Sequence, residues 1–266
     1  MMRGTLRFLT IVGSLALLST APASAQTAPS LGIAQSFVVL GGSTVTNTGP
    51  SVLNGDLGLS PGSAVTGFPP GLVVGGTIHA ADGVALGAQN SLTTAYNTAA
   101  GQACTQDLTG QDLGGKVLTP GVYCYSTSAQ LTGLLTLDAQ GNAASVFIFK
   151  MGSTLTTASS SSVVMANGGN QCNVFWQVGS SATLGTATSF AGNILALTSI
   201  SLTTGANIVG RALARNGAVT LDTNNITTAS CSAGSVPTLP EWAFLMLAVL
   251  LTAAGTVALR RRRQRI

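Results

Sequence analysis

The chain has 266 residues, enough for one large domain or two small ones, and only 7% of them are charged. Because 45% are apolar and 33 are glycine, the composition excludes an intrinsically disordered chain. The formal net charge of +4 comes from the two ends of the chain, since residues 26–236 carry four basic side chains against six aspartates, a formal charge of −2. This central part therefore has no electrostatic basis for binding nucleic acid.

The first segment is typical of an export signal. Arg3 and Arg7 precede an apolar stretch from Phe8 to Leu18, and Ala23-Ser24-Ala25 provides the small residues that a signal peptidase requires. The apolar stretch is too short to span about 30 Å of hydrocarbon as a helix. We therefore predict a signal peptide over residues 1–25, cleaved after Ala25.

The chain then continues with a β-rich segment and a helix. Residues 33–76 are interrupted by turns that contain glycine and proline, which favours short strands. In residues 82–104, by contrast, apolar side chains recur at helical spacing, and Asp82 is of a type that caps helix starts. The recurring side chains are Leu92, Ala95, Tyr96 and Ala99. We predict one amphipathic helix at about residues 82–104, packed along the rest of the domain.

All four cysteines lie in the part predicted to be exported, and an even number in an oxidising compartment favours two disulfides. Four cysteines can pair in three ways. We favour Cys104 with Cys124, which closes a short loop, and Cys172 with Cys231, which ties the end of the domain to its middle. Because there is no Cys-x-x-Cys pair and His79 is the single histidine, we predict no metal site and no cofactor.

The middle of the chain contains a degenerate repeat. Its leucines are spaced by 19, 18, 29, 18 and 19 residues: Leu118, Leu137, Leu155, Leu184, Leu202 and Leu221. The long interval holds a turn-rich insertion at Asn167–Gln171, so a period near 18 to 19 residues survives. The repeats are rich in Thr, Val, Ile and Ser, and no single repeat can bury its own inward side chains. The pattern predicts an all-β solenoid in which turns stack about 4.8 Å apart.

The C-terminal residues indicate a membrane segment. Residues 243–259 are predominantly apolar and precede an arginine-rich tail, 260–266, which should stay in the cytoplasm. Before them, residues 232–242 form a linker that ends in Val236-Pro237-Thr238-Leu239-Pro240-Glu241-Trp242. This sequence resembles the IPTL-type C-terminal sorting signals of Gram-negative bacteria, which implies recognition by a membrane processing enzyme. An ordinary membrane anchor is the alternative, and both place residues 26–231 outside the inner membrane.

Irregular motifs between residues 31 and 230 identify a family resemblance. They include Thr46-Asn47-Thr48-Gly49, Gly55-Asp56-Leu57-Gly58, Leu118-Thr119-Pro120-Gly121-Val122-Tyr123, Asn173-Val174-Phe175-Trp176-Gln177 and Gly210-Arg211-Ala212-Leu213-Ala214. In this order they resemble the microbial ice-binding proteins of the discontinuous β-solenoid type. The resemblance implies a right-handed β-solenoid of roughly triangular cross-section, one long α-helix alongside, and an N-terminal β segment that completes the stack out of sequence order.

The resemblance also implies a binding surface, namely a flat solenoid face with short side chains, often in a Thr-Ala/Gly-x-Thr/Asn pattern. The segments at 157–160, 186–189 and 204–207 match this pattern wholly or with Ser at the end, and the segment at 223–226 keeps only its first Thr. The expected ice-binding residues are Thr157, Ser159, Thr186, Thr188, Thr204, Ala206, Asn207 and Thr223. A second ladder stands immediately before the leucines: Thr136, Thr154, Thr183, Ser201 and Thr220. The sequence leaves open which ladder faces ice.

The residue types argue against catalysis. Residues 26–235 contain no Glu, and His79 has no evident partner in the sequence, so general acid–base pairs are scarce. We predict a monomeric, non-enzymatic ice-binding protein that is exported to the periplasm, cell surface or medium and held at least transiently by its C-terminal helix. The alternative is a non-enzymatic cell-surface adhesin or structural extracellular protein.

Overall fold

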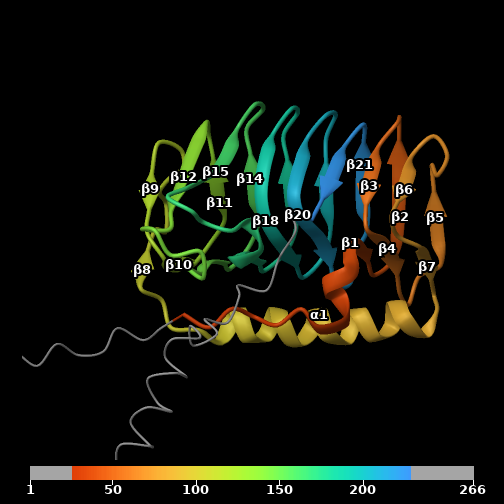
Figure 1. Cartoon of the computed structure of the whole chain (residues 1–266), viewed down its shortest axis with the longest axis horizontal. Helices are drawn as coiled ribbons and strands as arrows, with labels where there is room; N and C mark the ends of the chain where they lie inside the picture. Colours follow the sequence, from red (N-terminus) through yellow and green to blue (C-terminus); the bar gives the residue numbers. More distant parts are fainter. Residues whose placement is uncertain (1–25, 229–266) are drawn as a thin grey trace, which may run out of the picture.

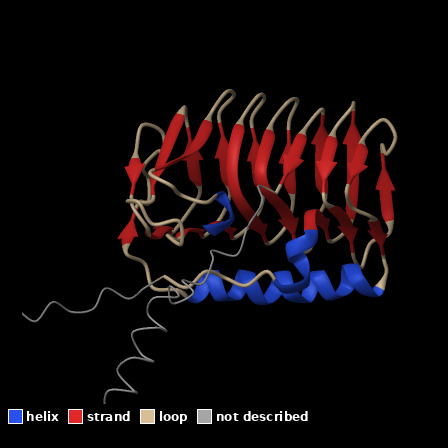
Figure 2. Ribbon diagram, viewed as in Figure 1, coloured by secondary structure: helices blue, strands red, loops and turns tan. Residues whose placement is uncertain are grey.

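Short parallel strands stack into a β-solenoid, with one helix along its length, in the computed structural model, which describes residues 26–228 (Figures 1 and 2). The predicted all-β solenoid with one long helix is confirmed. The predicted signal peptide, sorting motif, membrane helix and basic tail all lie outside the described residues. Within residues 26–228, no helix has the length and hydrophobicity needed to cross a membrane.

The stack has three sides. On the helix side lie β8 (Gln106–Asp107), β10 (Gly121–Tyr125), β13 (Phe147–Met151), β16 (Val174–Val178), the second halves of β18 (Ser189–Ala196) and β20 (Asn207–Ala214), β1 (Phe37–Gly41), β4 (Asp56–Leu59) and β7 (Ile78–Ala80). The seven-stranded sheet contains β11 (Ala129–Leu131), β14 (Leu155–Thr157), β17 (Ala182–Leu184), β19 (Ile200–Leu202), β21 (Val219–Asp222), β2 (Thr44–Thr48) and β5 (Ala64–Thr66). On the third side lie β9 (Val117–Leu118), β12 (Leu134–Asp138), β15 (Ser162–Ala166), the first halves of β18 and β20, β22 (Asn225–Thr227), β3 (Val52–Asn54) and β6 (Leu72–Val74).

The N-terminal strands stack out of sequence order, as the family resemblance implies. Strand β1 pairs with β20, β2 pairs with β21 and β3 pairs with β22, so the first rung of the chain lies directly on the last one. The next rung, formed by β4, β5 and β6, extends the stack further and ends it together with β7. Strands β7 and β8, which are consecutive in the chain, therefore lie at opposite ends of the solenoid.

Helix α1 (Gly83–Gly101) carries the chain back from β7 to β8, along one side of the stack (Figure 1). The predicted cap is confirmed, because the Asp82 carboxylate accepts a hydrogen bond of 2.8 Å from the Ala85 backbone N–H. The buried face of α1 consists of small and aliphatic side chains that pack on the short 3-10 helix η1 (Gly32–Ser36) and on the helix side of the stack. Leu92 and Ala95, both fully buried, belong to this contact.

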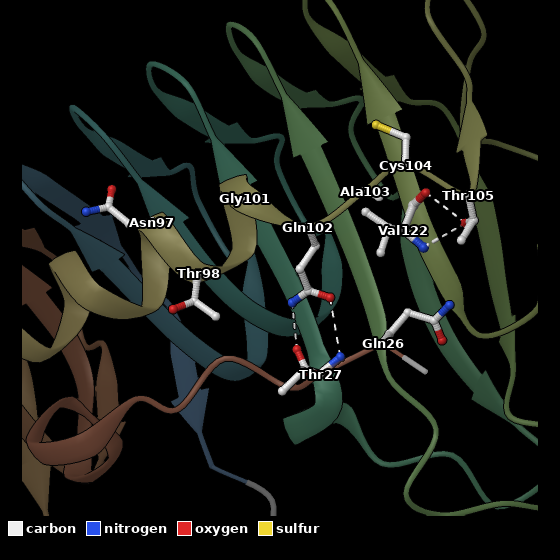
Figure 3. Close-up of a pocket in the computed structure, with 10 residues that line it drawn as sticks. All are labelled: Gln26, Thr27, Asn97, Thr98, Gly101, Gln102, Ala103, Cys104, Thr105 and Val122. Atoms are coloured by element: carbon white, nitrogen blue, oxygen red, sulfur yellow. Dashed lines mark hydrogen bonds between the residues drawn. The ribbon is translucent and has the colours of Figure 1, made fainter. Parts of the chain in front are cut away.

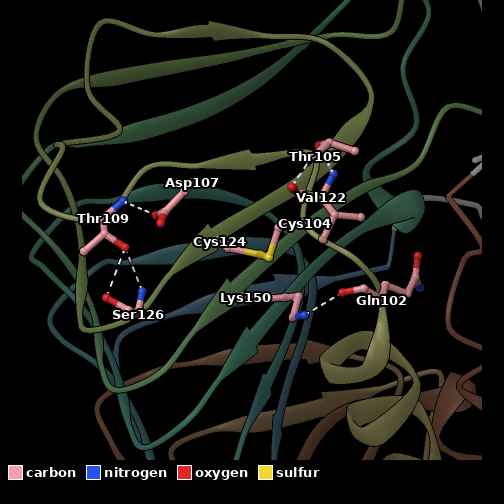
Figure 4. Close-up of a disulfide and its surroundings, with 9 residues drawn as sticks. All are labelled: Gln102, Cys104, Thr105, Asp107, Thr109, Val122, Cys124, Ser126 and Lys150. Atoms are coloured by element: carbon pink, nitrogen blue, oxygen red, sulfur yellow. Dashed lines mark hydrogen bonds between the residues drawn. A yellow bond between two sulfur atoms is a disulfide. The ribbon is translucent and has the colours of Figure 1, made fainter. Parts of the chain in front are cut away.

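The helix ends three residues earlier than the predicted boundary, and a disulfide follows it (Figure 4). Cys104 is bonded to Cys124 of β10, as predicted. The Lys150 ammonium donates a 2.6 Å hydrogen bond to the Gln102 carbonyl, where a cation also interacts favourably with the helix dipole. Cys172 is disulfide-bonded as well, and its predicted partner, Cys231, lies outside the described residues.

The core consists of columns of side chains that run along the stack. Tyr123, Phe149, Trp176 and Phe190 form an aromatic column, with ring centroids 5.3, 4.0 and 4.9 Å apart. All six repeat leucines are buried, but they do not form the single column that their alignment suggests. Three of them, Leu184, Leu202 and Leu221, share one register. Leu155 pairs instead with Ala182, and the first two leucines lie on the third side in β9 and β12.

Candidate functional site

The seven-stranded sheet presents a regular outward column of hydroxyl side chains. Its three-residue strands show the burial pattern buried, exposed, buried in β11, β14 and β17, so a single side chain of each strand points outward. The strand pairing places these side chains in one register across all seven strands: Gln130, Thr156, Thr183, Ser201, Thr220, Thr46 and Thr66. Six of the seven positions therefore carry a hydroxyl group.

Further hydroxyl groups flank this column on the side where the strands begin. The Thr154 hydroxyl donates a 2.8 Å hydrogen bond to the Ser128 hydroxyl on the neighbouring rung. One rung further, the Ser181 hydroxyl accepts a 3.3 Å bond from the Ser199 backbone N–H. These bonds run along the stack and hold the side chains in a fixed orientation. The surface is thus a grid of short side chains.

The electrostatics of this sheet are simple. Its strands contain one ionisable side chain, Asp222, which lies at the end of β21 and accepts a hydrogen bond from the Thr204 hydroxyl. Helix α1 covers a different side of the stack, so no described element of the chain covers the outward column (Figure 1). The sheet is a surface open to solvent whose one ionisable group, Asp222, lies at its edge.

The predicted ice-binding residues lie at the corner between the seven-stranded sheet and the third side, and the structure divides them. Backbone hydrogen bonds from Ser160 to Thr186, from Ala187 to Thr204 and from Gly205 to Asp222 align the successive corners. This alignment places Ser159, Thr186 and Thr204 in one exposed column at the edge of the sheet.

The remaining predicted residues do not join that column. Thr157, Thr188 and Ala206 are buried and point into the corner, where the hydroxyls of Thr157 and Thr188 lie 2.8 Å apart. Thr223 occupies the left-handed corner position, with φ of 56°, so Asp222 stands where the pattern leads one to expect a threonine. Asn207 is exposed but lies around the corner in β20, and its side-chain oxygen accepts a bond from the Asn225 backbone N–H.

The second ladder considered in the sequence comes closer to the observed column. Thr183, Ser201 and Thr220 are members of it, whereas Thr136 lies in β12 on the third side and Thr154 lies just before β14. Sequence reasoning missed Thr46 and Thr66, which reach the column only because the N-terminal rungs stack next to β21. The alternation of polar and apolar residues in Thr44-Val45-Thr46 was the sequence signal that could have placed Thr46 on the outward side of a strand.

A pocket lies near the end of α1, away from the seven-stranded sheet (Figure 3). Gln102 is held there by Thr27, since the Thr27 N–H donates to the Gln102 amide oxygen at 3.3 Å and the Gln102 amide donates to the Thr27 carbonyl at 2.6 Å. The lining side chains are uncharged and include the disulfide-bonded Cys104. These contacts attach the start of the described chain to the helix and bring together no chemically reactive group.

The single histidine does have a partner, which corrects the expectation from the sequence. His79 Nδ1 lies 2.7 Å from the Asp82 carboxylate. Hydrogen bonds from the Ala85 backbone and from His79 hold the pKa of the Asp82 carboxyl below its usual value. Because the same carboxylate caps α1, the pair is accounted for by the helix start.

Comparison with known proteins identifies relatives over most of the solenoid. A family model described as ice-binding-like matches residues 39–227. An ice-binding protein of Nostoc sp. (strain HG1) is 63% identical over 200 residues, which cover 75% of this chain and 74% of that protein. The crystal structure of an ice-binding protein from an Antarctic biological consortium has a TM-score of 0.75 and 45% identity, and the match covers 77% of this chain and 93% of that chain. An ice-binding protein from the Antarctic ascomycete Antarctomyces psychrotrophicus gives a TM-score of 0.74 at 43% identity, over 76% of this chain and 99% of that chain.

Proposed function

We propose that this chain, which belongs to the ice-binding-like family, binds ice crystals through the outward side of its seven-stranded sheet. The observation that carries the proposal is the in-register column of six hydroxyl side chains over seven strands. The exposed corner column of Ser159, Thr186 and Thr204 extends the same surface. The buried Thr157, Thr188 and Ala206 are not part of it.

The physical basis is a match between two regular lattices. Rungs repeat about every 4.8 Å along the stack, and alternate side chains along a strand are about 6.6 Å apart, so methyl and hydroxyl groups form a two-dimensional grid. Threonine is stiff at χ1 and loses little entropy when it is held in such a grid. Water that is hydrogen-bonded to the hydroxyls and confined between the methyls can then become continuous with the crystal. Binding accumulates over many weak contacts.

The test uses a bulky substitution in the middle of the column. Thr183→Tyr disrupts the grid and is expected to lose most of the thermal hysteresis and ice recrystallisation inhibition, because the face can no longer approach a flat crystal plane. Thr94→Tyr is the matched control, since Thr94 is an exposed threonine on α1, away from the sheet. A fragment of residues 26–235 is suitable for these measurements. The solved ice-binding protein of Antarctomyces psychrotrophicus, which folds as a separate protein, matches this chain over 99% of its own length.

The possible outcomes distinguish whether the chain binds ice at all from whether the seven-stranded sheet is the surface that binds it. If the wild-type fragment neither shapes ice crystals nor slows recrystallisation, the chain does not bind ice and the adhesive or structural alternative replaces the proposal. If the wild type is active and Thr183→Tyr is as active as Thr94→Tyr, another surface binds ice. Circular dichroism of all three proteins checks that the fold is unchanged.

We also propose that the chain is exported and sorted as its terminal segments predict, and that it has no catalytic role. The Cys104–Cys124 disulfide supports an oxidising compartment. The proposed path is cleavage after Ala25, transient anchoring by residues 243–259 and recognition of the sorting motif by a processing enzyme. Terminal sequencing of the protein recovered from the cell surface tests this, and a chain that retains residues 1–25 or its C-terminal arginines would contradict it.

A further inference from the structure

Exposed hydrophobic side chains gather at the two ends of the solenoid. Nine large ones are exposed among residues 26–228, and three of these, Val117, Leu134 and Val164, lie toward the β9 end. Five of the other six lie in β6, in β7 and in the first turn of α1, toward the end formed by β5, β6 and β7, and the sixth, Ile33, lies in η1 against Gly87 of α1. We call the surface at this end the open end, and its exposed apolar side chains are Leu72, Val74, Ile78, Val84 and Leu86. Exposed apolar clusters of this kind mark interaction sites.

At the open end, none of residues 26–228 covers the core of the solenoid. Ile78 continues the inward column of Val39 and Leu57, which are fully buried, yet 41% of Ile78 is exposed. Val65 and Val73 are likewise only partly buried, although they continue the core columns of the adjacent rung. At the opposite end, Leu108 and Leu113 from the loop between β8 and β9 are buried and cover the core. Within the described part of the chain, the core is therefore covered at one end of the stack and exposed at the other.

The backbone of the open end is also unpaired along one edge. Strands β5, β6 and β7 each pair with one described strand, so their outer edges present free N–H and C=O groups. Proteins usually protect such edges with charged side chains, but residues 57–78 contain no Asp, Glu, Lys, Arg or His. All three strands are three residues long. Strands β5 and β6 combine apolar core side chains with uncharged hydrogen-bonding edges, and the ionisable pair of the open end, His79 and Asp82, lies at β7 and the start of α1.

We propose that the open end binds the open end of a second copy of this chain, in place of the monomer that the sequence favours. A twofold axis perpendicular to the stack and through the seven-stranded sheet sets β5 against the β5 of the second copy, antiparallel to it. The same axis sets β6 against β7 of the other copy, and these two strands have equal length. The β5 edges that meet at the axis are uncharged, and the His79–Asp82 pair of each copy lies on the side that faces β6 of the other copy, which carries no charge. The core and the backbone ladders then continue from one copy into the other.

This arrangement has a consequence that rests on the proposed function. The axis keeps the two seven-stranded sheets on the same side, so the hydroxyl columns of both copies join into one surface of twice the length. Since ice affinity accumulates over area, the dimer should bind ice more strongly than the monomer. A single rung end is smaller than the roughly 800 Å² per partner of a standard interface, so we expect a weak dimer, with a dissociation constant on the order of 10–100 μM.

The test is sedimentation equilibrium of the 26–235 fragment over concentrations that bracket this constant, with two matched variants. Val74→Lys places a charge on the open end and should weaken the dimer about tenfold or more, because its ammonium group would be desolvated between β6 and β7 of the other copy. Val117→Lys makes the same change at an exposed valine of the opposite end and should leave the dimer intact. Both side chains are exposed, so neither change is expected to disturb the fold.

The result is independent of ice binding. A fragment that stays monomeric at all concentrations, or a dimer that Val117→Lys weakens as much as Val74→Lys does, would overturn the proposal. A dimer of the fragment that disappears when residues 236–266 are retained would assign the open end to the chain's own C-terminal segment and would overturn it as well. If the dimer forms as expected but no variant binds ice, the proposed function fails and the association stands.

Discussion

Replacing both Cys104 and Cys124 with serine tests how much of the stability depends on the attachment of α1 to the stack. The two cysteines are 20 residues apart in sequence, so their bond removes the closure entropy of a loop of that length from the unfolded chain. In the chain-entropy relation, such a loop corresponds to about 3 kcal/mol at 25 °C. For a domain of this size, 1 kcal/mol shifts the melting temperature by about 2–4 °C, which gives a decrease of about 6–12 °C.

Thermal unfolding followed by circular dichroism measures this decrease. The variant should keep its native spectrum at low temperature, because the core columns and the contacts of Leu92 and Ala95 remain. It should also keep its ice activity, since Cys124 lies in β10 on the helix side and not in the seven-stranded sheet. An unchanged melting temperature would refute the entropic argument. Complete unfolding would show that the stacked rungs contribute less to stability than we infer.

Two further predictions concern a buried hydroxyl and a helix cap. Thr188→Val should lower the free energy of unfolding, measured with denaturant, by about 1–2 kcal/mol, because it leaves the buried Thr157 hydroxyl without its 2.8 Å partner. The variant should retain ice activity. A loss of activity without a loss of stability would instead place Thr188 at the binding surface. Asp82→Asn removes the charge at the start of α1. The pKa of Asp82 is lowered in the folded protein, so the ionised carboxylate contributes to the free energy of unfolding. This stabilisation is fully present above the ordinary carboxyl pKa of about 3.9 and is lost as the pH falls through the lowered pKa. The difference in unfolding free energy between wild type and variant should therefore shrink on acidification below about pH 4, and a difference that is independent of pH would contradict this account.

The sequence alone was sufficient for the elements whose determinants are local. The spacing of Leu92, Ala95, Tyr96 and Ala99 predicts the helix, and Asp82 predicts its start, because both signals depend on residues within a few positions of one another. The richness in Thr, Val and Ile together with an 18-residue period predicts stacked short strands. The short loop between Cys104 and Cys124 favoured the observed disulfide.

The direction in which each threonine points was decided by the tertiary structure. Along one strand the side chains alternate, but each corner contains a residue with positive φ, such as Ser160, Ala187 or Thr223, and this residue breaks the alternation. Thr188, two positions after the exposed Thr186, therefore lies inside the corner. The last corner is one residue shorter than the one before it, which is why Asp222 and not Thr223 occupies the exposed position. Counting along the sequence does not carry across such corners.

Membership of the hydroxyl column depends on contacts between residues that are distant in the chain. Thr46 stands next to Thr220, 174 positions away, with their hydroxyls 3.4 Å apart, because β2 pairs with β21. No local pattern specifies that pairing, since a parallel ladder is selected by the burial of whole rungs and not by any single pair of side chains. Composition, period and caps thus determined that the chain forms a solenoid with a helix. The register of the stacked rungs decided which hydroxyls form one surface, because only stacking brings the first rung of the chain onto the last.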